Sequence, residues 1–126
     1  MKSNNIIQDK SFVFAIRIVN LYKYFINEKK EYLLSKQLLR SGTSIGANVE
    51  EAIGGLSEKD FLIRMGTAYK EARETVYWLR LLNASAYLSN KEFESLFHDA
   101  EEICKILGKI QTTVKSKNRN PIAPGS

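Results

Sequence analysis

Apolar residues recur every three to four positions through four long stretches of this chain, and no proline interrupts any of them. Pro121 and Pro124 are the two prolines, and both lie in the last six residues. Because proline kinks or breaks a helix interior, its absence leaves each stretch free to form one continuous helix. No stretch shows the strict alternation of a half-buried strand. The sequence therefore predicts an all-α fold.

The predicted helices span about residues 9–27, 32–54, 58–88 and 90–117. The last two begin with a serine followed three residues later by an acidic residue, at Ser57 and Ser89, which is capping-box spacing. The glycine pair at residues 54–55 is a helix-stop signal. Short connections between amphipathic helices predict an up-down antiparallel four-helix bundle over residues 1–117. Residues 118–126 lack periodicity, which predicts a disordered tail.

Two predicted helices carry more apolar residues than one buried face requires. The first has surplus residues on the arc opposite its main apolar face, and the third has them in its second half. The surplus residues that we assign to an interface are Val13, Ile16, Tyr77, Trp78, Leu81 and Leu82. Because a sizeable apolar patch on a soluble protein usually marks an interface, we expect this chain to form a homo-oligomer through these residues.

Gly42 and Gly46 lie one turn apart within the second predicted helix. Their spacing matches neither the phosphate-binding P-loop nor the dinucleotide fingerprint, and no predicted strand precedes them. Each glycine in a helix interior costs about 1 kcal/mol relative to alanine. We therefore expect a neighbouring helix to approach the backbone closely at these two positions, where a large side chain would hold the helices apart.

A polar stripe runs along the other side of the same helix. It consists of Arg40, Ser44, Asn48 and Glu51. Such a stripe can form a binding site. It can also consist of side chains that hydrogen-bond within the helix or bridge to a neighbouring helix, and we favour this second interpretation.

Basic residues concentrate toward the two ends of the chain, whose formal net charge is +5. Five cations and no acids lie between residues 105 and 119: Lys105, Lys109, Lys115, Lys117 and Arg119. A basic surface can bind nucleic acid through its phosphates, although cations are also favoured near a helix C-terminus by the helix dipole. No aromatic residue interleaves with this run, so the sequence gives no indication of base stacking there, and we expect low sequence specificity.

Groups suited to catalysis or metal binding are sparse. The single histidine, His98, lies beside the apolar stripe of the fourth predicted helix, and the single cysteine, Cys104, lies on it. Ser95 stands where a di-iron bundle would have glutamate, three residues before the histidine. We therefore expect no enzyme activity, metal, other cofactor or small-molecule substrate. With no apolar run of membrane-spanning length and no possible internal disulfide, we expect a cytoplasmic protein that makes no membrane contact.

Several short motifs resemble a known bacterial family. They are Gln37-Leu38-Leu39-Arg40, the run Ser44-Ile45-Gly46-Ala47-Asn48-Val49-Glu50-Glu51-Ala52, Ser57-x-x-Asp60-Phe61, and Lys70-Glu71-Ala72. Over about residues 11–115, the sequence resembles the four-helix-bundle proteins encoded by intervening sequences of 23S ribosomal RNA genes. The family is in turn similar to the accessory variability protein of diversity-generating retroelements. That similarity implies a homopentamer and a basic surface that binds nucleic acid and a reverse transcriptase. The polar stripe residues are family-signature positions without a known task.

Two hypotheses follow for the function. The leading one is a non-enzymatic, homo-oligomeric bundle that binds RNA or DNA through the five cations of residues 105–119, as an accessory to a reverse transcriptase or another nucleic-acid enzyme. The alternative is a scaffold that binds another protein through Tyr77, Trp78, Leu81 and Leu82, with no direct role in nucleic-acid binding.

Overall fold

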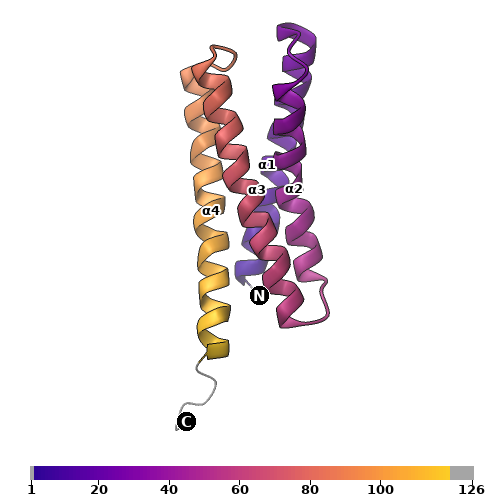
Figure 1. Ribbon diagram of the computed structural model, residues 1–126, viewed down its shortest axis with the longest axis vertical. Coiled ribbons are helices and arrows are strands. Elements are labelled where there is room, and N and C mark those ends of the chain that lie inside the picture. The colour runs from indigo at the N-terminus through magenta and orange to yellow at the C-terminus, as the bar shows by residue number, and fades with distance from the viewer. Residues whose placement is uncertain (1, 120–126) are drawn as a thin grey trace.

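Four helices lie side by side, and successive helices run in opposite directions (Figure 1). The computed structural model describes the backbone of residues 2–119 and the side chains of residues 6–117. The helices are α1 (Lys2–Tyr24), α2 (Leu34–Ile53), α3 (Glu58–Ala84) and α4 (Asn90–Arg119), and a short π-helix, η1 (Phe25–Lys29), extends α1. The prediction of an all-α four-helix bundle is confirmed.

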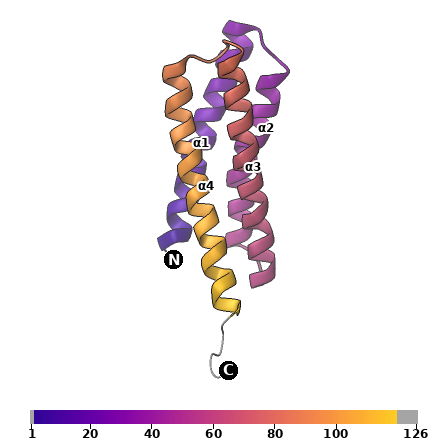
Figure 2. The same ribbon diagram turned by 60° about the vertical axis from the view of Figure 1, so that its left-hand side comes forward.

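Each helix packs mainly on its neighbours along the chain: α1 on α2, α2 on α3, and α3 on α4. The contact between α1 and α4, which closes the bundle, is smaller. Two ion pairs cross it, Lys10 with Glu102 at 3.2 Å and Arg17 with Asp99 at 2.6 Å. Figure 2 shows the bundle from a side on which α4 lies in front. The fully buried side chains at the centre come from all four helices and include Phe14, Ile18, Leu38, Ile45, Met65, Leu79, Ile103 and Leu107. Among residues 2–119, no helix combines the length and the apolar character needed to cross a lipid bilayer.

The helix starts follow from local hydrogen bonds. Ser57 Oγ accepts from the backbone N–H of Asp60 at 3.1 Å, and Ser89 Oγ accepts from that of Glu92 at 3.2 Å. These contacts satisfy backbone donors that the first turns of α3 and α4 would otherwise leave free. The two predicted capping serines therefore act as caps in the structure.

The start of α2 is capped from outside the helix. The carboxylate of Glu31 accepts backbone N–H bonds from Leu33, Leu34 and Ser35 at 3.2, 3.0 and 2.7 Å. Partial burial works to raise the pKa of Glu31, but these hydrogen bonds together hold it below its usual value. The charged form of Glu31 is thus part of the structure that starts α2.

Several helix boundaries differ from the predicted ones. Helix α1 begins at Lys2 rather than near residue 9, because Ile7 is fully buried in the core and keeps the first turns in contact with the bundle. Helix α3 ends at Ala84 rather than near residue 88, since the backbone turns at Ala86, whose φ is 67°. The first two residues of the predicted tail, 118–119, extend α4, and the rest of that tail lies outside the described residues.

The surplus apolar residues do not form one patch. Val13, Ile16 and Tyr77 are about half exposed, at 57%, 48% and 53%. Val13 and Ile16 lie on α1, whereas Tyr77 lies on α3, and neither helix packs mainly on the other. Leu82 was predicted wrongly as an interface residue, because it is fully buried in the core of the single chain. The reason is that α3 packs on both α2 and α4, which widens its buried arc beyond a single stripe.

Candidate functional site

A groove of about 690 Å³ follows the line where α3 packs on α4. Two arginines from α3 and two lysines from α4 line it, together with one acid, one thiol and two aromatic rings. These residues are Arg73, Arg80, Lys105, Lys109, Glu101, Cys104, Tyr69 and Phe97. We call Arg73, Arg80, Lys105 and Lys109 the groove cations.

Helical spacing places the groove cations on facing sides of the two helices. Arg73 and Arg80 are two turns apart on α3, and Lys105 and Lys109 are one turn apart on α4, so each pair points to one side of its helix. All four residues are exposed. Among the described side chains, no carboxylate forms an ion pair with any of them, and Glu101 is the one acid among the described lining residues. The groove is therefore positively charged.

The two aromatic rings lie toward opposite ends of the groove. Near one end, Tyr69 faces Gly108, where an added Cβ would lie 3.9 Å from Tyr69 Cε1. Tyr69 Oη accepts a hydrogen bond from Arg73 Nη1 at 3.2 Å, and this bond raises the already high pKa of Arg73. Near the other end, Phe97 lies about three turns before Gly108 on α4. Its ring stacks on Phe93, with ring centroids 5.3 Å apart.

The sequence does not indicate base stacking because residues 105–119 contain no aromatic residue, and the two rings come from outside that run. That interpretation considered residues 105–119 alone, whereas the groove lies between two helices. Tyr69 comes from α3, and Phe97 comes from an earlier turn of α4 on the side that faces the groove. Cations and aromatic rings therefore share one surface that a search along a single helix does not find.

Only part of the predicted cationic run lies in the groove. Lys105 and Lys109 line it. Lys115 and Lys117 are exposed on later turns of α4, beyond the lining residues, and the side chain of Arg119 lies outside the described part of the chain. Sequence reasoning missed Arg73 and Arg80, although their spacing of seven residues does place both on one side of α3.

The single thiol and the single histidine have different surroundings. Cys104 borders the groove but is only 8% exposed, and burial raises its pKa, with Glu101 adding to the increase and Arg73 opposing it. Its neutral form is therefore favoured. His98 is exposed on α4. Within the described residues, His, Cys, Asp and Glu form no group of three or more that could hold a metal ion.

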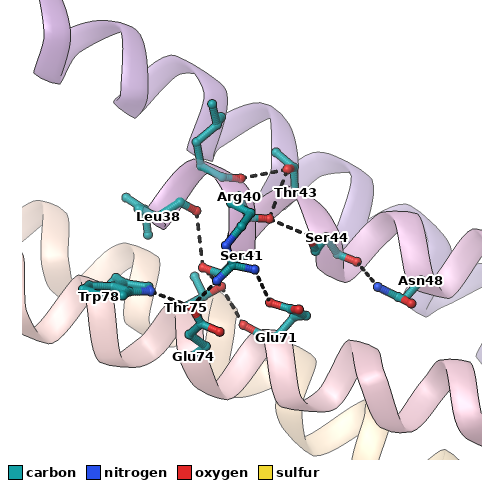
Figure 3. Close-up of polar contacts among 11 residues, drawn as sticks. Leu38, Arg40, Ser41, Thr43, Ser44, Asn48, Glu71, Glu74, Thr75 and Trp78 are labelled. Carbon is teal, nitrogen blue, oxygen red and sulfur yellow. Dashed lines mark hydrogen bonds and ion pairs between the residues drawn. The ribbon is translucent and has the colours of Figure 1, made fainter. Parts of the chain in front are cut away.

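One end of the polar stripe of α2 contacts α3 through Arg40 (Figure 3). Arg40 pairs with Glu74 and, at 3.3 Å, with Glu71. Trp78 Nε1 donates to the same Glu74 carboxylate at 2.9 Å. At the far end of the stripe, Glu51 pairs with Arg64 at 3.0 Å.

Two stripe residues hydrogen-bond within α2 itself. Ser44 Oγ donates to the Arg40 carbonyl at 2.7 Å, and Asn48 Nδ2 donates to the Ser44 carbonyl at 2.9 Å (Figure 3). The contacts of all four stripe residues fit the interpretation that they join α2 to α3 and satisfy backbone carbonyls.

The two glycines of α2 face α1. A Cβ added to Gly42 would lie 2.9 Å from both Cγ1 and Cγ2 of Ile18, closer than real Cβ atoms approach another heavy atom. A Cβ added to Gly46 would lie 3.4 Å from the backbone oxygen of Ser11, which is ordinary contact. At Gly42 the Ile18 side chain therefore fills the space that a Cβ would need, whereas at Gly46 the backbone of α1 itself comes into contact.

Comparisons with known proteins agree with the fold. The chain matches the family profile described as "23S rRNA-intervening sequence protein" over residues 3–109. It is also similar to a crystal structure of a protein with unknown function from the S23 ribosomal protein family of Bacteroides thetaiotaomicron VPI-5482. The two are 50% identical with a TM-score of 0.86, over 87% of this chain and 98% of that one. No curated protein matches the chain.

Proposed function

The chain belongs to the family of 23S rRNA-intervening sequence proteins. We propose that it is a non-enzymatic, homo-oligomeric bundle that binds RNA or DNA. The observation that carries the proposal is the convergence of the four groove cations along the contact between α3 and α4. We place the phosphates of the nucleic acid against these side chains.

The surroundings of the groove cations suit phosphate binding. Their heads are exposed and have no carboxylate partner among the described residues, so a phosphate does not have to displace an ion pair. An arginine can hold a phosphate through two parallel hydrogen bonds, and lysine acts as a point charge. Contacts of this kind release counterions from the nucleic acid and do not depend on its sequence.

The buried thiol of Cys104 is poorly suited to nucleophilic catalysis. Nucleophilic catalysis by a cysteine requires the thiolate, and the raised pKa of this buried side chain favours the neutral thiol.

A protein that binds nucleic acid without transforming it would serve as an accessory to a nucleic-acid enzyme, and a reverse transcriptase is the partner that we propose.

The distribution of exposed apolar residues supports assembly through two different surfaces. Val13 and Ile16 expose one apolar area on α1, and Tyr77 with the half-buried Leu81 exposes another on α3. Contact between α1 of one copy and α3 of the next would be head-to-tail, and such contacts form closed rings when the rotation between copies closes. We propose a ring of this type, with five copies.

Light scattering tests the assembly. We expect a molar mass that is a whole multiple of the 14.4 kDa of one chain, and a fivefold mass for the pentamer. A mass of one chain at micromolar concentration would contradict assembly, and any other multiple would contradict the number five.

The alternative role as a protein scaffold has less support. Of its four residues, Leu82 is buried in the core and Trp78 is held by Glu74, which leaves Tyr77 and Leu81 as its accessible surface. This surface is also the one that we assign to contact between copies.

A salt titration tests nucleic-acid binding. Fluorescence anisotropy with a labelled, structured RNA is expected to show binding at low salt that weakens steeply as salt is added. If all four groove cations contact phosphates, a plot of log K against log salt should have a slope of roughly −3 to −4. Absence of binding at low salt, or binding that salt does not change, would contradict the proposal.

A further inference from the structure

The α3–α4 groove combines the two components of a single-strand binding site. Resting on the proposed function, we propose that the groove binds a single-stranded segment of RNA or DNA, with bases stacked on Phe97 and Tyr69 and phosphates held by the groove cations. Proteins that bind single strands without sequence preference combine a positively charged groove with aromatic rings that stack on bases.

Both rings are held in place before any ligand binds. Phe97 is half-buried and stacks on Phe93 at an interplanar angle of 30°. Tyr69 is also half-buried, and the Arg73 guanidinium lies 5.9 Å from its ring centroid. Rings that are already fixed lose little conformational freedom when a base stacks on them. Each therefore provides a firm surface at the edge of the groove.

The positions of the rings fit a short length of strand. Phe97 and Gly108, the residue that faces Tyr69, are eleven residues apart on α4, or roughly 16 Å along the helix axis. At ~3.4 Å per stacked base, this distance accommodates about five bases. Arg73, Lys105 and the other groove cations lie along the same stretch, where the sugar-phosphate chain would run.

The shape of the site favours a single strand over a duplex. In a duplex, each base is already stacked and paired, so its face is not available to an aromatic side chain. Proteins read duplex DNA by placing a protruding helix or ribbon into a groove of the nucleic acid. Here the rings and cations line a concave surface between two helices instead.

Glu101 also fits bases better than phosphates. Its carboxylate lies among the groove cations and would repel a phosphate placed beside it. A carboxylate accepts hydrogen bonds from exocyclic amino groups, such as that of cytosine. In a single strand those amino groups are not engaged in base pairs and can donate to Glu101.

The experiment compares a labelled single strand of about 12 nucleotides with a duplex of the same length, at the same salt concentration. We expect the wild-type protein to bind the single strand at least about tenfold more tightly. Phe97→Leu, which removes the ring but keeps an apolar side chain, should weaken single-strand binding by about 5- to 150-fold and leave duplex binding unchanged. Tyr69→Leu should act in the same direction.

Three control variants accompany these. Phe97→Tyr and Tyr69→Phe retain the rings and should restore most of the single-strand affinity that the leucine variants lose. Tyr32→Leu removes an exposed aromatic ring from the connection between α1 and α2, remote from the groove, and should leave binding unchanged. Circular dichroism establishes that each variant is folded, and the comparison of strand with duplex on the wild-type protein does not depend on any variant.

The outcomes separate this inference from the proposed function. If strand and duplex bind equally well, or if folded Phe97→Leu and Tyr69→Leu proteins bind the strand as the wild type does, the proposed stacking on the rings is contradicted. The proposed binding of nucleic acid by the groove cations is not affected by either result. If poly-glutamate competes as well as an unlabelled strand of equal charge, the groove recognises charge alone, which also overturns stacking. If neither nucleic acid binds at low salt, the proposed function fails as well.

Discussion

Replacing Gly42 by leucine is expected to lower the free energy of unfolding by more than about 3 kcal/mol, a large part of the ~5–15 kcal/mol that stabilises a domain. Even the Cβ of a new side chain would lie 2.9 Å from two carbons of Ile18. Ile18 is fully buried and branched at Cβ, so it has little freedom to rotate away. The wider side chain would have to push α1 off α2.

Alanine substitutions at the two glycines provide the matched comparison. Alanine gains about 1 kcal/mol of helix propensity at either position. At Gly46 the added Cβ meets the Ser11 backbone at 3.4 Å, so the gain should remain and the protein should be as stable as wild type or more stable. At Gly42 overpacking, typically ~1–3 kcal/mol, should offset or exceed the gain. Urea denaturation followed by circular dichroism measures both. A Gly42→Leu protein as stable as wild type would mean that α1 and α2 are not this close.

Neutralising the four groove cations is expected to weaken RNA binding by roughly 100- to 1,000-fold at ~0.1 M salt. Each phosphate contact with a single strand contributes about 0.7 to the slope of log K against log salt, so four contacts contribute almost three decades at this concentration. The variant carries Arg73→Gln, Arg80→Gln, Lys105→Gln and Lys109→Gln. Its salt slope should also be smaller by about 3. Anisotropy titrations at several salt concentrations measure the two quantities together.

A second variant with the same change in net charge is the control. Lys23, Lys29, Lys30 and Lys36 are exposed around the connection between α1 and α2, away from the groove. Replacing these four by glutamine should leave most of the affinity in place. Equal losses in the two variants would show that overall charge, rather than the groove, drives binding.

The double variant Lys115→Gln, Lys117→Gln tests the exposed lysines beyond the groove. We expect it to lose less RNA affinity than the groove variant.

The start of a helix could be predicted from the sequence where the capping contact joins residues close together in the chain. Ser57 and Ser89 mark helix starts because a cap is a contact between residues three positions apart. The start of α1 was predicted too late, because polar residues around Ile7 hide the fact that this side chain reaches the core. The cap of α2 was harder to predict, since it comes from Glu31, three residues before the first helical residue, and glutamate is not among the preferred N-cap residues.

The candidate site was predictable only on one of its two sides. Lys105 and Lys109 were found because they belong to one charged run. Arg73 and Tyr69 were missed, because they become part of the same surface only when α3 packs on α4, and the sequence does not state which faces meet. The wrong assignment of Leu82 has the same origin, since α3 has two neighbours and buries more of its circumference than one stripe.

Trp78 is the one tryptophan of the chain. Its indole N–H donates a hydrogen bond to the carboxylate of Glu74, which also pairs with Arg40. Its emission therefore reports on the contact between α2 and α3. The groove lies on the other side of α3, along α4. Intrinsic fluorescence can thus follow unfolding in the same sample in which a labelled oligonucleotide follows binding, and the two signals come from opposite sides of one helix.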